Sequence, residues 1–212
     1  MCDFANGSHL PHLHEDEYAL DTPLIRSLVA HVKAQTAASG TARDACNALR
    51  PAFQGLLAAR DWLPQSFQEP VPDSGMGGGI GQWLLYRSAD RSLSLFSLVV
   101  PPGSRTPIHD HLAWGLIGLY AGNQDEELYA PAATGMELTK QRPLVPGDYY
   151  ILVPPLDDIH CVRTTSDVTS VSIHLLANDT GCTERHTYDA STGAASPFVS
   201  GYANAECAAA AV

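Results

Sequence analysis

The chain has 212 residues and a formal net charge of −11. This length fits one domain of moderate size with its own hydrophobic core. The negative charge argues against nucleic acid or an anionic membrane surface as a partner. No stretch is apolar enough to span a bilayer, and the polar N-terminus does not look like a secretory signal. The five cysteines show no CxxC pairing, which favours reduced thiols and therefore a cytoplasmic protein.

The sequence pattern of the N-terminal third predicts an arm followed by helices. Residues 1–16 are expected to form a mobile arm, and residues 17–66 two or three helices packed outside the main domain. Pro23 suits the first turn of a helix that ends at Ser39-Gly40. A second helix is expected over residues 41–60, where Pro51 should kink it or split it in two. The arm also holds three histidines, which could form a metal cluster but more simply belong to a disordered tail: His9, His12 and His14.

The remainder of the chain predicts a mainly β domain over residues 70–204, followed by a frayed end at 205–212. Proline and glycine separate short apolar or alternating runs, as is typical of an all-β sandwich or barrel. Strands are expected at residues 82–87, 93–100, 114–121, 126–130, 135–141, 148–153, 160–164, 168–176 and 186–189.

Two histidines stand in the segment PPGSRTPIHDHLAWGLIGLYAG, which has strand-like flanks on both sides. His109 and His111 are two residues apart, so in a strand both imidazoles would project from the same face. His160 lies in another strand-like run, which can lie beside the first across a small barrel. We therefore predict a three-histidine metal site. Cys161 would point to the opposite face of its strand from His160, so it is not expected to be a ligand.

Three neutral imidazoles without a carboxylate suit a borderline divalent metal such as iron, nickel, cobalt or zinc. This ligand set leaves the site with a high positive charge, which favours a soft anionic ligand such as a thiolate. It also leaves coordination positions free for a substrate and dioxygen.

Further polar residues are candidates for the surroundings of such a metal. Ser172 and His174 share one strand face and could form a hydrogen-bond relay near the metal, or simply a bonded polar pair in the core. Arg185 could bind a substrate carboxylate through paired hydrogen bonds, or lie on the surface. Gln82 and Arg87 are weaker candidates for the same pocket.

The framing residues resemble the two halves of the cupin signature. Gly103 lies six residues before the His-x-His pair, and Gly147, Pro155 and His160 follow in order. Common cupins carry a glutamate four residues after the second histidine of the pair, and here that position is Gly115. The resemblance implies a jelly-roll-like β-barrel with the metal site inside it.

Within cupins, the chain resembles the thiol dioxygenases, the group of bacterial cysteine and 3-mercaptopropionate dioxygenases. The motifs that carry this likeness are TPIHDHLAWGLIGLYAG, LDDIHCV, VSIHLLAND with the following Arg185, and PFVSGYAN. The resemblance implies ferrous iron on His109, His111 and His160, with nickel or another divalent metal as the alternative. It also implies that a small thiol and dioxygen react to give a sulfinate, that Arg185 and Gln82 bind the substrate, and that the protein is a monomer or homodimer.

One position departs from the family pattern. The thiol dioxygenases have a Ser-x-His-x-Tyr triad, but here the tyrosine position is Leu176. The tyrosine–cysteine crosslink of the mammalian enzymes is also impossible, because the second partner falls near Gly115. The change leaves open which thiol is oxidised and whether carbon or nitrogen is lost as well. The alternatives are a three-histidine cupin that oxidises a carbon substrate and a non-catalytic cupin that binds a small molecule.

Overall fold

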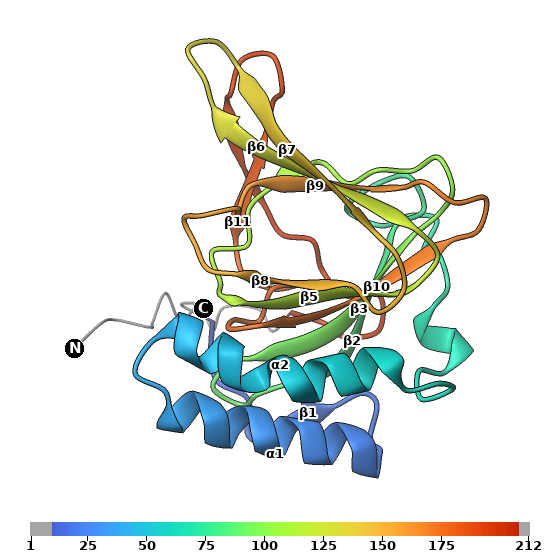
Figure 1. Cartoon of the computed structure of the whole chain (residues 1–212), viewed down its shortest axis with the longest axis vertical. Helices are drawn as coiled ribbons and strands as arrows, with labels where there is room; N and C mark the ends of the chain where they lie inside the picture. The colour runs from blue at the N-terminus through green and yellow to red at the C-terminus, as the bar shows by residue number, and fades with distance from the viewer. Residues whose placement is uncertain (1–9, 208–212) are drawn as a thin grey trace.

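The computed structural model describes residues 10–207. Two antiparallel sheets of six strands face each other, and two helices cover the outer face of one of them (Figure 1). The first sheet has the order β1 (Glu17–Tyr18), β2 (Gly81–Arg87), β3 (Ser94–Val100), β10 (Ser170–Leu176), β5 (Gly115–Ala121) and β8 (Tyr149–Leu152). The second has the order β12 (Ala195–Phe198), β11 (Arg185–Tyr188), β4 (Ile108–His109), β9 (His160–Thr164), β6 (Gln124–Pro131) and β7 (Met136–Leu144). The predicted mainly β class is confirmed.

The helices are α1 (Pro23–Ala38) and α2 (Ala42–Ala58), followed by a single 3₁₀ turn, η1 (Gln65–Phe67). Each α-helix begins after a threonine whose hydroxyl accepts a backbone N–H of the first turn, which satisfies one of the free donors there. The expectation that Pro51 could split the second helix is wrong, because α2 runs through it. Pro51 is exposed, while buried Leu49 and Phe53 on either side of it pack into the core.

Two hydrophobic clusters explain the layers. The outer cluster joins α1 and α2 to the first sheet through residues such as Ile25, Phe53 and Leu116. The inner cluster lies between the two sheets and includes Phe96 and Leu176. The His174 ring stacks on Phe96 of this cluster and lies near the His111 ring, so the barrel interior holds both the second core and polar groups.

The expectation that His109 and His111 lie in the same strand is wrong. β4 contains only Ile108–His109, and His111 lies in the loop that leads to β5. The chain turns there because the Asp158 carboxylate accepts the backbone N–H groups of His111 and Leu112, at 2.9 and 3.3 Å. Leu112 then takes a positive φ of 54°.

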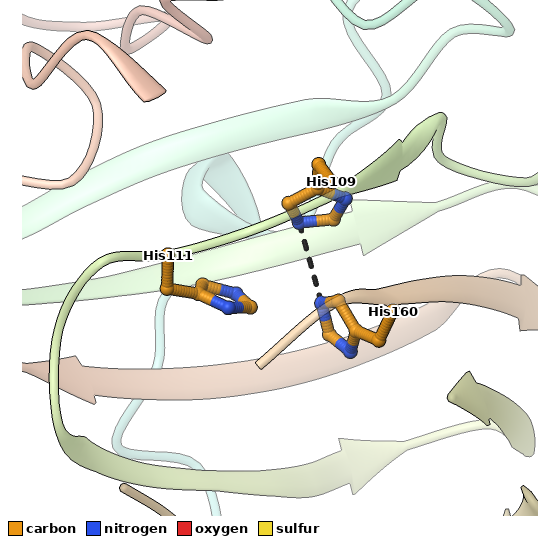
Figure 2. A group of neighbouring side chains, drawn as sticks. All are labelled: His109, His111 and His160. Atoms are coloured by element: carbon orange, nitrogen blue, oxygen red, sulfur yellow. Dashed lines mark hydrogen bonds between the residues drawn. The ribbon is translucent and has the colours of Figure 1, made fainter. Parts of the chain in front are cut away.

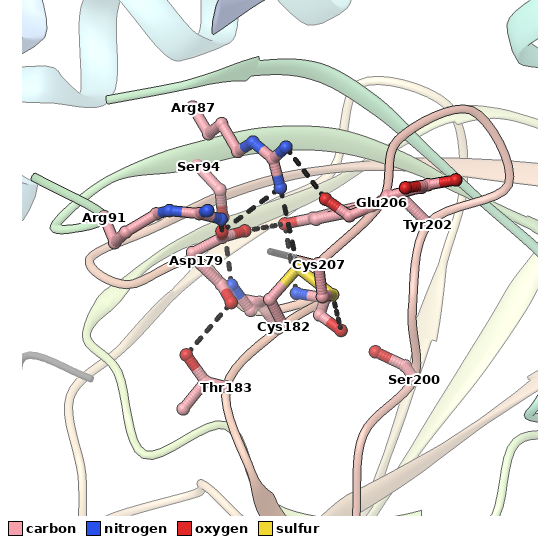
Figure 3. Close-up of a disulfide and its surroundings, with 12 residues drawn as sticks. Arg87, Arg91, Ser94, Asp179, Cys182, Thr183, Ser200, Tyr202, Glu206 and Cys207 are labelled. Carbon is pink, nitrogen blue, oxygen red and sulfur yellow. Dashed lines mark hydrogen bonds and ion pairs between the residues drawn. A yellow bond between two sulfur atoms is a disulfide. The ribbon is translucent and has the colours of Figure 1, made fainter. Parts of the chain in front are cut away.

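A disulfide corrects the expectation that the thiols are reduced. Cys182 and Cys207 are bonded (Figure 3), whereas Cys46 and Cys161 are free and buried. Cys2 lies outside the described residues. The bond anchors residues 199–207, which we call the C-terminal strap. The strap also bonds to β2, because Ala203 N–H donates to the Gln82 carbonyl at 2.8 Å. Residues 205–207 of the expected frayed end are therefore fixed in place, and residues 208–212 lie outside the described part.

The expected arm is only partly described, because residues 1–9, including His9, lie outside it. The backbone N–H of Leu13 donates to the Ala89 carbonyl at 2.8 Å, and Asp16 accepts the Tyr86 hydroxyl at 2.9 Å. The end of the arm is thus bonded to the sheet. Among residues 10–207, no helix has the length and hydropathy that crossing a bilayer requires.

Candidate metal centre

The structure brings the three predicted histidines together inside the barrel. His109 on β4 pairs directly with His160 on β9, and His111 reaches the same place from the loop after β4 (Figure 2). One ligand atom from each residue lies within 4.8 Å of the others, and all three side chains are buried. They form a group able to hold a divalent metal ion, and it is the one such group of three or more potential ligands found among residues 10–207.

Each imidazole is oriented by an acceptor on its Nδ1 side. His109 Nδ1 lies 2.9 Å from the Pro107 carbonyl, and His111 Nδ1 lies 3.2 Å from Asp158 Oδ1. His160 Nδ1 lies 2.6 Å from Glu126 Oε2. Carbonyl and carboxylate oxygens only accept, so Nδ1 is the donor in each neutral ring. The Nε2 lone pairs are therefore free to bind a metal.

The Nε2 atoms of His109 and His160 face each other at 3.3 Å (Figure 2). Burial lowers the pKa of His109 and His111 well below the usual imidazole value, and the neighbouring His160 and Arg185 act in the same direction. With the proton on Nδ1 in both rings, the two Nε2 lone pairs would oppose each other in the buried interior, and a cation between them would remove this repulsion. Two imidazoles bound to one ion at about 2.1 Å have an N–N separation of this size. The residues fit a metal ion.

A carboxylate ligand after the His-x-His pair is excluded by the backbone. A Cβ atom at Gly115 would lie 2.0 Å from the Leu175 carbonyl oxygen, inside any real contact distance. Gly115 is also the cross-strand partner of Leu176, whose side chain packs over it. Leu176, which stands where the thiol dioxygenase pattern has a tyrosine, is fully buried in the inner cluster.

Ser172 and His174 form the bonded pair that their spacing allows. Ser172 Oγ lies 3.0 Å from His174 Nε2, and both side chains are buried. The His174 ring stacks on Phe96 and lies 6.4 Å, centroid to centroid, from the ring of His111. His174 Nδ1 has no hydrogen-bond partner among the described residues. The pair thus lies beside the three histidines with one nitrogen unused.

Arg185 is buried rather than superficial, with 2 % of its surface exposed. Its Nη1 donates to the Asp110 carbonyl at 2.9 Å and its Nη2 to Ser200 Oγ at 2.7 Å, while Nε has no partner among residues 10–207. The guanidinium also lies 4.9 Å from the ring centroid of Phe198. Burial lowers its pKa to about 10, and the Asp110 charge partly opposes this shift. The side chain therefore remains a cation at neutral pH.

Gln82 lies at a pocket of about 220 Å³ between the loop before β2 and the strap. Its Nε2 is buried without a partner among the described residues, and Ser200 lines the same pocket. A larger pocket of about 460 Å³, beside α1 and the β2–β3 turn, includes none of the predicted site residues.

Arg87 does not belong to the pocket. It pairs with Glu17 at 2.7 Å. It also pairs with Asp179 at 3.4 Å and donates to the Glu206 carbonyl of the strap (Figure 3). Arg91, which is fully buried, pairs with the same Asp179. Arg87 is therefore a structural ion-pair residue.

Three residues near the site were not predicted from the sequence: Glu126, Asp158 and Ser200. Asp158 stands two residues before His160 in LDDIHCV, so its proximity to the site could have been predicted from the sequence. Glu126 contacts His160 only because β6 and β9 are paired, with Leu128 opposite His160. Ser200 lies in the motif PFVSGYAN, but its contact with Arg185 depends on the course of the strap. The contact between Glu126 and His160 leaves no local signal.

No family model matches the chain. Solved structures with a similar arrangement include an uncharacterised protein with a double-stranded β-helix domain from Klebsiella pneumoniae. It is 11 % identical with a TM-score of 0.44, and the match covers 57 % of this chain and 91 % of that one. A cupin-family protein with the same fold from Methanocaldococcus jannaschii is 12 % identical with a TM-score of 0.38, covering 48 % and 82 %.

An oxalate decarboxylase from Lactobacillus farciminis is 15 % identical, with a TM-score of 0.35 and coverage of 42 % of this chain. The matched part is 25 % of the decarboxylase, so this chain spans a quarter of its length. Two of these three neighbours are described as a cupin or a double-stranded β-helix protein. All three TM-scores lie below 0.5, so no property of these neighbours is assigned to this chain.

Proposed function

We propose that this chain is a mononuclear metal-dependent oxygenase that oxidises the sulfur of a small thiol carboxylate with dioxygen, giving a sulfinate. Ferrous iron is the expected metal, and nickel is the alternative. The ligands would be His109, His111 and His160. The absence of a carboxylate ligand, which Gly115 enforces, supports a site that takes up an anionic sulfur ligand.

The observation that carries the proposal is that the Arg185 guanidinium is buried without a carboxylate partner among residues 10–207. A buried guanidinium is costly unless an opposite charge compensates it. Among residues 10–207, no carboxylate oxygen lies within 4.0 Å of it. It nevertheless lies close to the metal group, because it donates to the carbonyl of Asp110, the residue between His109 and His111, and the Phe198 ring beside it lies 6.5 Å from the His109 ring. A substrate carboxylate would supply the missing negative charge.

Two unpaired donor atoms also support an anionic ligand with several acceptors. In the described part of the chain, Gln82 Nε2 and Arg185 Nε are buried and have no hydrogen-bond partner. Buried donors left without acceptors cost free energy, about 1–3 kcal/mol each. Ser200 connects them, because it accepts from Arg185 and lines the pocket at Gln82. A carboxylate lying against these groups would satisfy both donors.

In the proposed reaction, Arg185, Gln82 and Ser200 bind the carboxylate and hold the thiol near the three histidines. When bound, the metal supplies a Lewis acid that favours the thiolate and an electron path to dioxygen. His174, whose ring Ser172 fixes, takes the thiol proton on Nδ1. Burial lowers the pKa of His174 well below the usual value, so the ring does not retain this proton, which is released to solvent as H⁺. The S–H and O–O bonds break, two S–O bonds form, sulfur loses the electrons that dioxygen gains, and the product leaves as the sulfinate anion.

The test is oxygen uptake by protein reconstituted separately with iron(II) and nickel(II). The substrates are cysteine, 3-mercaptopropionate, mercaptosuccinate and cysteamine, with mass analysis of the products. Uptake with a carboxylate thiol and a product heavier by two oxygen atoms supports the proposal. A product that has also lost carbon or nitrogen would assign altered chemistry to the site with Leu176. No uptake with any thiol under either metal would refute it.

Arg185→Ala isolates the role of the arginine. The variant should raise the KM for 3-mercaptopropionate by about 10- to 100-fold, because a charged hydrogen bond of about 1.5–3 kcal/mol is lost. The KM for cysteamine, which has no carboxylate, is the internal control and should change little. An equal change for both thiols would mean that Arg185 acts on the fold and not on the carboxylate.

A further inference from the structure

Two buried carboxylates lie directly behind the proposed ligands. Glu126, on β6, is fully buried and has one oxygen 2.6 Å from His160 Nδ1. Asp158, in the loop before β9, is 5 % exposed. It accepts three N–H groups, namely His111 Nδ1, the His111 backbone and the Leu112 backbone. Two of the three imidazoles are therefore held by a carboxylate on the side away from the site.

Neither carboxylate has a lysine or arginine partner within 4.0 Å among residues 10–207, and their ion-pair contacts are to histidines alone. The residue opposite Glu126 across β6 and β7 is Arg142, but Arg142 donates to Asp157 at 3.2 Å. Glu126 Oε1 has no hydrogen-bond partner among the described residues. Since no lysine or arginine lies within 4.0 Å of the buried Glu126 carboxylate among the described residues, a cation held by the three-histidine group would help to balance its charge.

We propose that Glu126 and Asp158 are positioning residues that fix the Nδ1–H form of His160 and His111 and supply the negative charge that the ligand set lacks. Two carboxylates one imidazole away from the ion balance a divalent charge. They also raise the basicity of the rings that bind it. The inference concerns metal binding, and it holds whether or not a thiol is the substrate.

This arrangement changes the electrostatic expectation for the site. The ligands themselves are neutral, which favours an anionic ligand on the metal. The two carboxylates behind them offset that positive charge, so Arg185 is the remaining cation for the substrate. Selection of an anionic substrate would then depend on Arg185 more than on the metal.

The first test measures cobalt(II) binding to metal-free protein. Isothermal titration calorimetry gives the Kd, and visible absorption reports on the bound ion. Glu126→Gln and Asp158→Asn keep an acceptor oxygen and remove the charge. Each should raise the Kd for cobalt(II) by about 10- to 100-fold and shift the absorption bands. Glu127→Gln is the matched control, because it removes a carboxylate one position along β6 on the opposite face. Its Kd should stay within about twofold of the wild type. Equal Kd values for Glu126→Gln, Asp158→Asn and Glu127→Gln would overturn the proposal.

The second test needs no substitution, so it decides the matter even if a variant fails to fold. Nitrogen-15 NMR of the histidine side chains in metal-free wild-type protein reports which ring nitrogen carries the proton. Nδ1–H forms at His111 and His160 are expected. Nε2–H forms at these positions would contradict the proposal. Neither test uses a thiol, so failure of the oxygenase function leaves both readouts intact.

Discussion

Cys207→Ser should destabilise the fold by a predictable amount. The Cys182–Cys207 bond closes a loop with a sequence separation of 25. In the chain-entropy description, a cross-link over this length stabilises the folded state by about 3.5 kcal/mol, because it restricts the unfolded chain. For a domain of this size, the loss corresponds to a fall in Tm of roughly 7–14 °C. The measurement is thermal unfolding by circular dichroism, on metal-free protein so that ligand binding does not mask the change.

Wild-type protein treated with a dithiol reductant is the control. Its Tm should fall to that of the variant, whereas the variant should not respond to the reductant. The strap should also loosen locally, with faster hydrogen exchange at the Ala203 N–H that donates to Gln82. A Tm shift of less than about 2 °C, or a response of Cys207→Ser to the reductant, would refute the reasoning.

Three further outcomes are expected. His109→Ala should abolish stoichiometric metal binding, measured by elemental analysis after reconstitution, whereas wild-type protein should retain one ion per chain. The metal-free protein should lose stability as pH falls through and below about 6.5, because burial lowers the pKa values of His109, His111 and His174 and the unfolded chain then binds more protons. Each histidine contributes up to about 1.4 kcal/mol per pH unit, and denaturant titrations between pH 5 and 8 that show no slope would contradict this. Gly115→Ala should yield little folded protein, because its Cβ meets a backbone carbonyl. A variant with wild-type Tm would show that β5 and β10 can separate at no cost.

The metal group was predictable because its evidence is local. His109 and His111 are close in sequence, and the surrounding Gly and Pro positions narrow the architecture that can hold them. Strand alternation alone, however, does not explain why both imidazoles point toward the same site. His111 lies beyond the strand, and the Asp158 carboxylate turns its backbone toward the site. The right residues were found although the strand is shorter than expected.

The missed features depend on contacts between distant segments. Glu126 lies in the polar run QDEE at the start of β6, which is typical of a solvent-facing segment, and only the β6–β9 pairing reveals its role. β12 was not expected, since Ala195–Phe198 contains a proline and small residues, and it lies at a sheet edge where a proline is tolerated. The Cys182–Cys207 bond could not be deduced, because spacing alone does not specify which cysteines meet.

The close approach of β5 and β10 at Gly115 also has an evolutionary meaning. Glycine and glutamate codons can differ by a single nucleotide, so the change from a three-histidine set to one with a carboxylate looks like a short step in sequence. Here it is a long step in structure, because the Leu175 carbonyl occupies the space that any side chain would need. A lineage with this backbone would first have to move one strand against the other. The spacing of β5 and β10 therefore restricts the ligand set at this position as firmly as the three histidines define it.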